Sequence, residues 1–211
     1  MCWNEEVSLN TFLFSTFVLC IVYYNNTYTK YKIKEFNNKW LYIFFMSAIL
    51  MQLIEFFIWR NIKNKNYNKI FTMLAFILIF SQPIASLMIL SNYQIRNIML
   101  LIYLILGIPY LFFIILTTKF YSTVSSSGNL EWNLKINKIF FWIWLFFLLF
   151  SLFYEKKWLY LIFGIVTFSI FMYKEYKTSG SLWCWFVNSI SIYLAIYLLF
   201  YLPFHEKNKI C

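Results

Sequence analysis

Residues 40–59 read WLYIFFMSAILMQLIEFFIW, a run of 20 residues in which Glu55 is the one formally charged side chain. A helix of about 20 predominantly apolar residues crosses the roughly 30 Å hydrocarbon core of a bilayer. This run therefore predicts a transmembrane helix, and similar runs recur along the whole chain.

The composition indicates the same environment. Of 211 residues, 62% are hydrophobic and 12% are charged. Soluble domains carry about 25% charged residues, so this chain has too few polar side chains to cover a surface that faces water. We predict an all-α integral membrane bundle that occupies residues 1–211 as a single polytopic domain without a soluble domain.

The number of crossings follows from the apolar runs. Seven runs are bounded by Lys, Asn, Glu or Ser, and they are residues 7–24, 40–59, 70–90, 98–116, 139–154, 158–173 and 181–203. The fifth and sixth are separate spans because a single helix would place Glu155, Lys156 and Lys157 at its centre. The first lacks the basic start and small-residue cleavage site of a signal peptide and is expected to be retained. Residues 117–137 form the longest connection, and its Ser-rich part, residues 122–129, predicts a flexible loop.

The basic residues are expected to meet lipid. The net charge of +10 arises from 18 Lys and Arg against eight acids, and the cations fall between the apolar runs. There they flank spans and contact anionic headgroups, so the predicted partner is the bilayer and not a nucleic acid. Nine cations fall on each side, but the first span has Glu5 and Glu6 before it and four lysines after it. This favours an N-terminus outside or lumenal and leaves homo-oligomerisation open.

Several enzyme classes lack their residues. The chain has no Asp, its sole histidine is His205 near the C-terminus, and no Gly-rich phosphate loop is present. Aspartyl proteases, Ser/His/Asp hydrolases and histidine-ligated zinc or haem sites are therefore disfavoured. We expect no metal and no cofactor, and an enzyme is the weakest of the functional interpretations.

Glu55 is the strongest local signal. It is the single acid or base inside the seven runs, and Gln52, Glu55 and Trp59 share one helical face. An ionised carboxylate is costly in hydrocarbon, so Glu55 is expected to face the bundle interior.

An odd number of crossings places the start of the chain, the end of the second span and the starts of the third and seventh spans on one side. We therefore predict a polar pocket that opens on that side, and its members are Gln52, Glu55, Gln82 and Asn188 with Trp59 beside them and Cys2 and Cys184 near its mouth. Pro83 is expected to free the carbonyl of Ile79 for an outside donor.

Three interpretations of this pocket remain open. In the first, the polar side chains only form interhelical hydrogen bonds with one another and so stabilise the bundle. In the second, they bind a small polar or cationic solute or protons, and in the third they catalyse a reaction. Cys2 and Cys184 form a disulfide if their side is extracytosolic, and otherwise stay free thiols. A metal site of Cys2, Cys184 and Glu55 is a weak alternative because it lacks histidine.

The same residues carry a resemblance. Met1-Cys2-Trp3, Gln52-x-x-Glu55 with Trp59, and Trp183-Cys184 resemble a family of uncharacterised polytopic membrane proteins of bacteria and large DNA viruses, with Ser8 a further match. The resemblance implies that Cys2, Glu55 and Cys184 form one constellation, and it lends no activity. This chain has Met51-Gln52 where bacterial members have His-Gln. Together with the AT-rich character of the composition, the resemblance favours a viral source.

Overall fold

The fold is known from a computed structural model, which describes residues 4–30, 32–126, 128–133, 137–174 and 183–207. Eight α-helices are present in this part of the chain: α1 (Glu5–Tyr28), α2 (Lys39–Arg60), α3 (Lys65–Leu87), α4 (Tyr93–Thr117), α5 (Lys138–Tyr154), α6 (Trp158–Lys174), α7 (Trp183–Ile196) and α8 (Leu202–Lys207). A short 3-10 turn (Lys34–Asn37) precedes α2, and a π-helical turn (Tyr197–Tyr201) joins α7 to α8 just before Pro203. The described strands are β1 (Thr123–Val124) and β2 (Leu130–Glu131), which pair antiparallel.

Asparagine side chains begin the first five helices. Each accepts a hydrogen bond from a backbone N–H in the first turn, and the five caps are Asn4, Asn38, Asn64, Asn92 and Asn137. Such caps satisfy amides that have no partner within the helix. The caps also explain why α3 and α4 begin five residues before the predicted spans: the polar residues after Asn64 and Asn92 are already helical.

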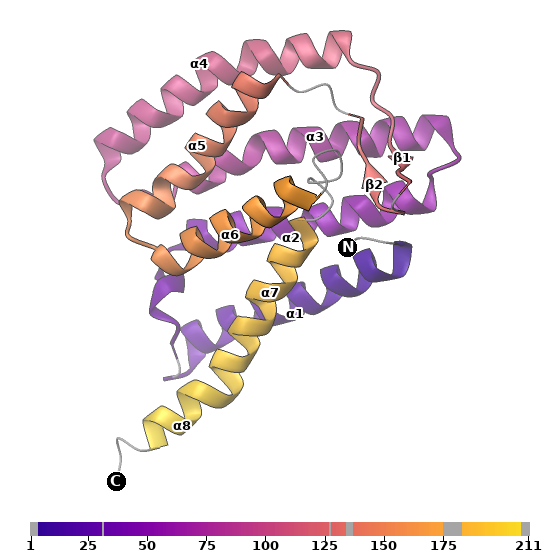
Figure 1. Cartoon of the computed structure of the whole chain (residues 1–211). Helices are drawn as coiled ribbons and strands as arrows, with labels where there is room; N and C mark the ends of the chain where they lie inside the picture. Colours follow the sequence, from indigo (N-terminus) through magenta and orange to yellow (C-terminus); the bar gives the residue numbers. More distant parts are fainter. Residues whose placement is uncertain (1–3, 31, 127, 134–136, 175–182, 208–211) are drawn as a thin grey trace.

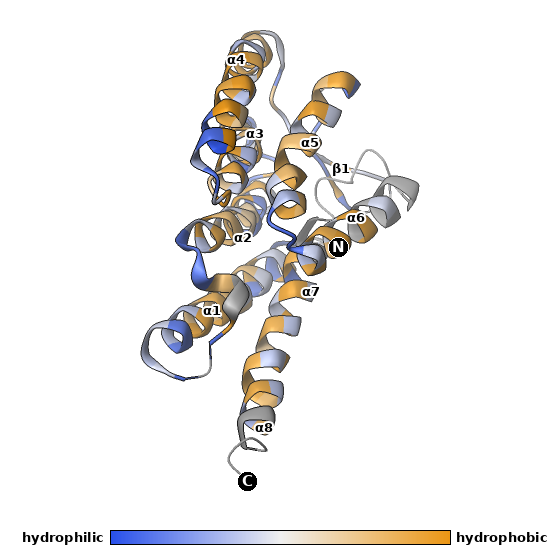
Figure 2. Cartoon of the chain, turned by 90° about the vertical axis from the view of Figure 1, so that its left-hand side faces the viewer, coloured by the Kyte–Doolittle hydropathy of each residue, from blue (hydrophilic) through white to orange (hydrophobic). Residues whose placement is uncertain are grey.

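The helices form two layers. Figure 2 shows α1, α2, α3 and α4 in one row, with α5, α6 and α7 in a second row against it. The chain runs back and forth along the long direction of the bundle, so α1 begins at one end and α8 finishes at the other (Figure 1). We call these the N-terminal end and the C-terminal end.

Five described helical segments are long and apolar enough to cross a membrane. They are Glu5–Tyr28, Lys39–Arg60, Lys65–Leu87, Tyr93–Thr117 and Val187–Phe204. The fifth and sixth predicted spans are helices of 17 residues each, α5 and α6. The all-α membrane architecture is therefore supported, while the structure identifies five spanning candidates and not the predicted seven.

The second helix lies at the centre of the bundle. In its most apolar window 61% of the residues are buried, against 17% in α4, whose outer side chains are apolar and exposed. Phe45 and Ala48 of α2 belong to one hydrophobic core with residues of α1, α5, α6 and α7. A side chain on this face of α2 is shielded from lipid on every side.

The gap that Pro83 leaves in α3 is closed by a side chain of a neighbouring helix. Pro83 has no N–H, and the Nε1–H of Trp144 in α5 donates to the carbonyl of Ile79 at 2.9 Å. This confirms the expectation that Ile79 accepts from outside its helix. At the next residue along α3, the Tyr103 hydroxyl of α4 donates to the Phe80 carbonyl at 2.7 Å. Both bonds satisfy carbonyls where hydrocarbon offers no donor.

The long connection between α4 and α5 is docked on the bundle. Ser122 is fully buried, and its backbone N–H donates to the Asn68 side chain of α3 at 2.8 Å. Leu130 and Trp132 pack with Met51 and Ala75 of α2 and α3. Polar anchors and two buried apolar side chains thus hold the described part of this connection over the N-terminal end, whereas the flexibility predicted for residues 122–129 stays a prediction.

Gly107 sets the distance between α3 and α4. A Cβ at this position would lie 2.6 Å from Cζ of Phe80, whose ring also packs against Tyr103. We expect Gly107→Ala to destabilise the protein by about 1–3 kcal/mol through overpacking, measured by unfolding in detergent micelles. Ile105→Ala, on the lipid-facing side of α4, is the control. Equal stabilities of the two variants would contradict this packing.

Candidate functional site

Glu55 lies inside the bundle. Its side chain is 0% exposed, and neither carboxylate oxygen has a hydrogen-bond partner among the residues that the structure describes. It precedes the last residue of α2, Arg60, by five positions, which is about 7 Å along a helix. The structure therefore places this acid where the sequence predicted it, away from lipid.

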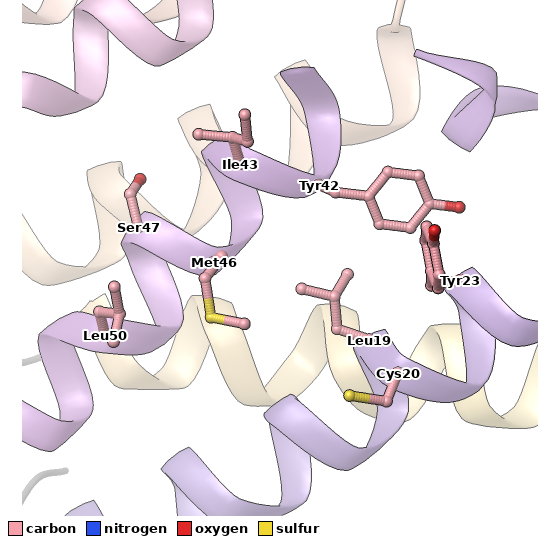
Figure 3. Close-up of a pocket in the computed structure, with 8 residues that line it drawn as sticks. All are labelled: Leu19, Cys20, Tyr23, Tyr42, Ile43, Met46, Ser47 and Leu50. Atoms are coloured by element: carbon pink, nitrogen blue, oxygen red, sulfur yellow. The ribbon is translucent and has the colours of Figure 1, made fainter. Parts of the chain in front are cut away.

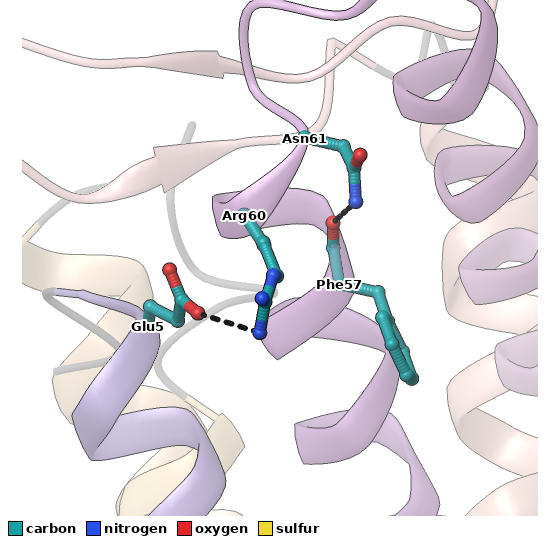
Figure 4. A network of polar contacts seen from close by, with 4 residues as sticks. All are labelled: Glu5, Phe57, Arg60 and Asn61. Carbon is teal, nitrogen blue, oxygen red and sulfur yellow. Dashed lines mark hydrogen bonds and ion pairs between the residues drawn. The ribbon is translucent and has the colours of Figure 1, made fainter.

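Two contacts give the register of α1 against α2. Nη1 of Arg60 lies 3.6 Å from Oε1 of Glu5 at the N-terminal end (Figure 4). Near the other end, the rings of Tyr23 and Tyr42 meet edge to face at 5.7 Å. The two pairs follow one antiparallel register, so Thr11, six residues after Glu5, lies level with the residue that precedes Glu55.

The buried face of α1 is polar at this level. Ser8, Thr11 and Ser15 are all buried, and the Asn188 side chain of α7 donates to Oγ1 of Thr11 at 2.9 Å. The hydroxyl oxygen of Ser15 has no partner in the described part of the chain. We name these residues of α1, together with Gln52 and Glu55 of α2 and the half-buried Asn188 of α7, the buried polar belt: Ser8, Thr11, Ser15, Gln52, Glu55 and Asn188.

The belt occupies one half of the interior. Beyond Ser15 the buried residues of α1 become apolar, as in Val18 and Val22. On α2 the same change occurs between Gln52 and Ala48. The belt therefore lies near the N-terminal end, and the interior toward the C-terminal end is mainly apolar, with Ser47, Gln82 and Ser86 among the buried polar exceptions.

Gln82 lies deeper than the predicted pocket. Phe57 of α2 and Phe71 of α3 stack at 5.0 Å, which sets the antiparallel register of these helices. Gln82 is then level with Met46, nine residues or about 14 Å along α2 from Glu55. It is 2% exposed, and its Nε2 has no acceptor among the described residues. The structure thus brings Gln52, Glu55 and Asn188 to neighbouring levels and leaves Gln82 apart, one turn before Ser86 on α3.

The remaining predicted residues have different placements. Trp59 is half-buried and packs against the cluster of Met51 and Ala75 between α2 and α3. Cys2 lies outside the described residues. The backbone of Cys184 belongs to the first turn of α7, but its side chain is outside the described part of the chain. The predicted pairing of Cys2 with Cys184 stays a prediction.

Charged groups cover the belt at the N-terminal end. Arg60 is ion-paired with Glu5, and its guanidinium lies 5.9 Å from the ring centroid of Phe56. Asn61 donates from its side chain to the Phe57 carbonyl at 2.9 Å and so closes the end of α2 (Figure 4). Arg60 and Glu5 are 65% and 42% exposed, so this charged pair lies at the surface of the bundle, about five residues along α2 from Glu55.

The belt offers oxygen ligands. Carboxylate, amide and hydroxyl oxygens suit protons and hard cations better than soft metals. No group of three or more His, Cys, Asp or Glu side chains meets in the described part of the chain. The chemistry that this arrangement can support is the binding of a small cation or a proton at a single carboxylate.

Sequence reasoning missed the contribution of α1. Ser8, Thr11 and Ser15 follow the spacing i, i+3 and i+7, which places them on one helical face. That polar stripe within an apolar run is the signal that would have identified the first helix as a wall of the site.

No model of a known protein family matches the chain, and no curated protein or solved structure is significantly similar to it. The geometry of the site therefore carries the functional argument.

The bond between Thr11 and Asn188 can be tested by a double-mutant cycle. Thr11→Val and Asn188→Leu remove its two partners and keep side-chain size similar. We expect a coupling energy of about 0.6 kcal/mol, with about 1.7 kcal/mol as the upper end for bonds between membrane helices. The measurement is unfolding in detergent of both single variants and the double variant. A coupling energy of zero would show that α1 and α7 do not meet through this pair.

Proposed function

We propose that this chain is an integral membrane protein with seven crossings that binds a small cation, or a proton, at Glu55. The N-terminus lies outside or in the lumen, and entry is from the N-terminal end. Membership of the polytopic family with the Met-Cys-Trp opening is part of the proposal, and it adds no activity.

One observation carries the proposal. The Glu55 carboxylate is fully buried, and neither of its oxygens has a protein partner among the described residues. A buried carboxylate without donors is strongly disfavoured unless a proton or a cation neutralises it. A structural role alone would be better served by an acid that is hydrogen-bonded, or by an apolar side chain of similar size.

The charge of the site favours a monovalent ligand. Glu55 is the single acid of the belt, so one proton or one monovalent cation neutralises it. Ser8 and Thr11 lie within two residues of its level in the α1–α2 register and offer neutral hydroxyl oxygens. A divalent cation would leave an uncompensated positive charge in a low-dielectric interior, which is costly.

The competing function is structural. The bond from Asn188 to Thr11 already pairs the amide of α7 with α1. An envelope or scaffold protein would use such a bond to hold its helices together, without a ligand.

Seven crossings predict a labelling pattern. The Ser91 N–H and hydroxyl both donate to Glu155, so the loops that contain Asn92 and Lys156 lie together at the C-terminal end. Single cysteines that replace Asn92 and Lys156 should therefore react with a membrane-impermeant maleimide from the same side of a proteoliposome. A cysteine that replaces Lys63 should react only from the other side. Labelling of Lys156→Cys and Lys63→Cys from the same side would rule out the crossing of α5.

Cation or proton flux through proteoliposomes tests whether Glu55 binds such a ligand. Proteoliposomes that hold the full chain should dissipate an imposed pH or potassium gradient faster than empty liposomes, as measured with an entrapped pH dye. Glu55→Gln keeps the shape of the side chain but cannot carry the charge, so its rate should fall at least about tenfold, toward that of empty liposomes.

The matched control is Glu6→Gln, which removes an exposed acid at the start of α1. It should leave the rate unchanged. A native protein without flux or specific cation binding, or a Glu55→Gln protein as active as the native one, would contradict the proposed function.

A further inference from the structure

A groove opens on the outer surface of α1 and α2, toward the C-terminal end. It has a volume of about 440 Å³, and its walls are Leu19, Cys20, Tyr23, Tyr42, Ile43, Met46, Ser47 and Leu50 (Figure 3). Met46 is nine residues, or two and a half turns, from Glu55 and hence on the opposite side of α2. The groove is therefore separate from the buried polar belt and faces lipid.

The depth of the groove matches one leaflet. Its walls run from Tyr42 to Leu50 along α2, about 12 Å of helix. Half of a roughly 30 Å hydrocarbon core is about 15 Å. An acyl chain that lies along Leu19, Met46 and Leu50 would fill most of this depth.

The outer end of the groove is polar and ordered. Tyr23 and Tyr42 meet there, and both side chains carry their hydroxyls at the same end of the groove in Figure 3. The Tyr42 oxygen accepts from Nδ2 of Asn26 at 2.9 Å, and Asn26 also bonds to the backbone of Ile33. This network fixes the end of α1, the following segment and the start of α2 around the mouth.

Basic residues surround this mouth. Lys39 precedes Tyr42, Ile43 and Met46 by three, four and seven residues, so it lies on the groove-lining face of α2, one turn above the tyrosines. Lys39 and Lys32 are exposed. The charge that Lys32 and Lys39 bring to this end of the groove is positive, and it adjoins the amide end of α2, which also favours anions.

We propose that this groove is a binding site for an anionic phospholipid. One acyl chain lies between α1 and α2, and the phosphate lies at Lys39 with the tyrosine hydroxyls beneath it. Neutral lipid fits the apolar walls equally well, so the lysine is what selects the anionic headgroup.

Native mass spectrometry of the purified full chain tests the site. The protein is delipidated in detergent and then offered phosphatidylglycerol and phosphatidylcholine in equal amounts. We expect one phosphatidylglycerol to be retained about fivefold better than phosphatidylcholine, the preference that one lysine near the headgroups supplies. Lys39→Gln should bring this ratio close to one.

Further variants distinguish lipid binding in the groove from a general attraction between basic residues and anionic lipid. Lys63→Gln removes an exposed lysine at the N-terminal end and should leave the ratio unchanged. Leu50→Trp fills the inner end of the groove at a position that is 36% exposed, and it should lower retention of both lipids; Ser47→Leu is a second filling variant. Equal retention of the two lipids by the native chain, equal losses in Lys39→Gln and Lys63→Gln, or unchanged retention in both filling variants would overturn the proposal.

Discussion

Hydrocarbon supplies neither a hydrogen-bond donor nor an acceptor, so every polar group inside the membrane has to be paired within the protein. This constraint accounts for the helical fold and for the asparagine caps at its helix starts. It also accounts for Trp144, whose indole N–H serves the carbonyl that Pro83 frees. Where backbone pairing fails in this bundle, a side chain from a neighbouring helix replaces it.

Several buried polar atoms lack a partner in the described structure, Ser15 Oγ and Gln82 Nε2 among them, and Glu55 differs from these in being an acid. The described structure satisfies Ser86 through α5 and Asn188 through α1, yet it provides no partner for the carboxylate of Glu55. A bundle in which the Trp144 indole bonds to the carbonyl that Pro83 frees could equally have placed a donor beside the Glu55 carboxylate. An acid without a partner among the described residues, with hydroxyls of α1 near its level, is therefore better explained by a ligand that comes and goes than by a structural bond.

The sequence predicted the positions of seven helices and the inward direction of Glu55, because both follow from hydropathy and helical period. It misplaced Gln82, since the polar residues after Asn64 lengthen α3 and carry Gln82 deeper along α2. It overlooked Thr11, because a single hydroxyl in an apolar run is a weak signal, and only its spacing from Ser8 and Ser15 marks a polar face of α1. The groove was also beyond its reach, since its walls depend on which faces of α1 and α2 meet.

Carbodiimide modification tests the central claim most directly, because it reports the environment of the acid itself. Native protein in lipid is treated with a hydrophobic or a water-soluble carbodiimide, and modified carboxyls are mapped by mass spectrometry. The hydrophobic reagent should modify Glu55, and a bound cation or a higher pH, which deprotonates the carboxyl, should slow that reaction. Of the two acids Glu55 and Glu6, the water-soluble reagent should modify Glu6 alone. Modification of Glu55 by the water-soluble reagent as fast as Glu6, or no response to either cation or pH, would contradict a shielded, ligand-binding carboxylate.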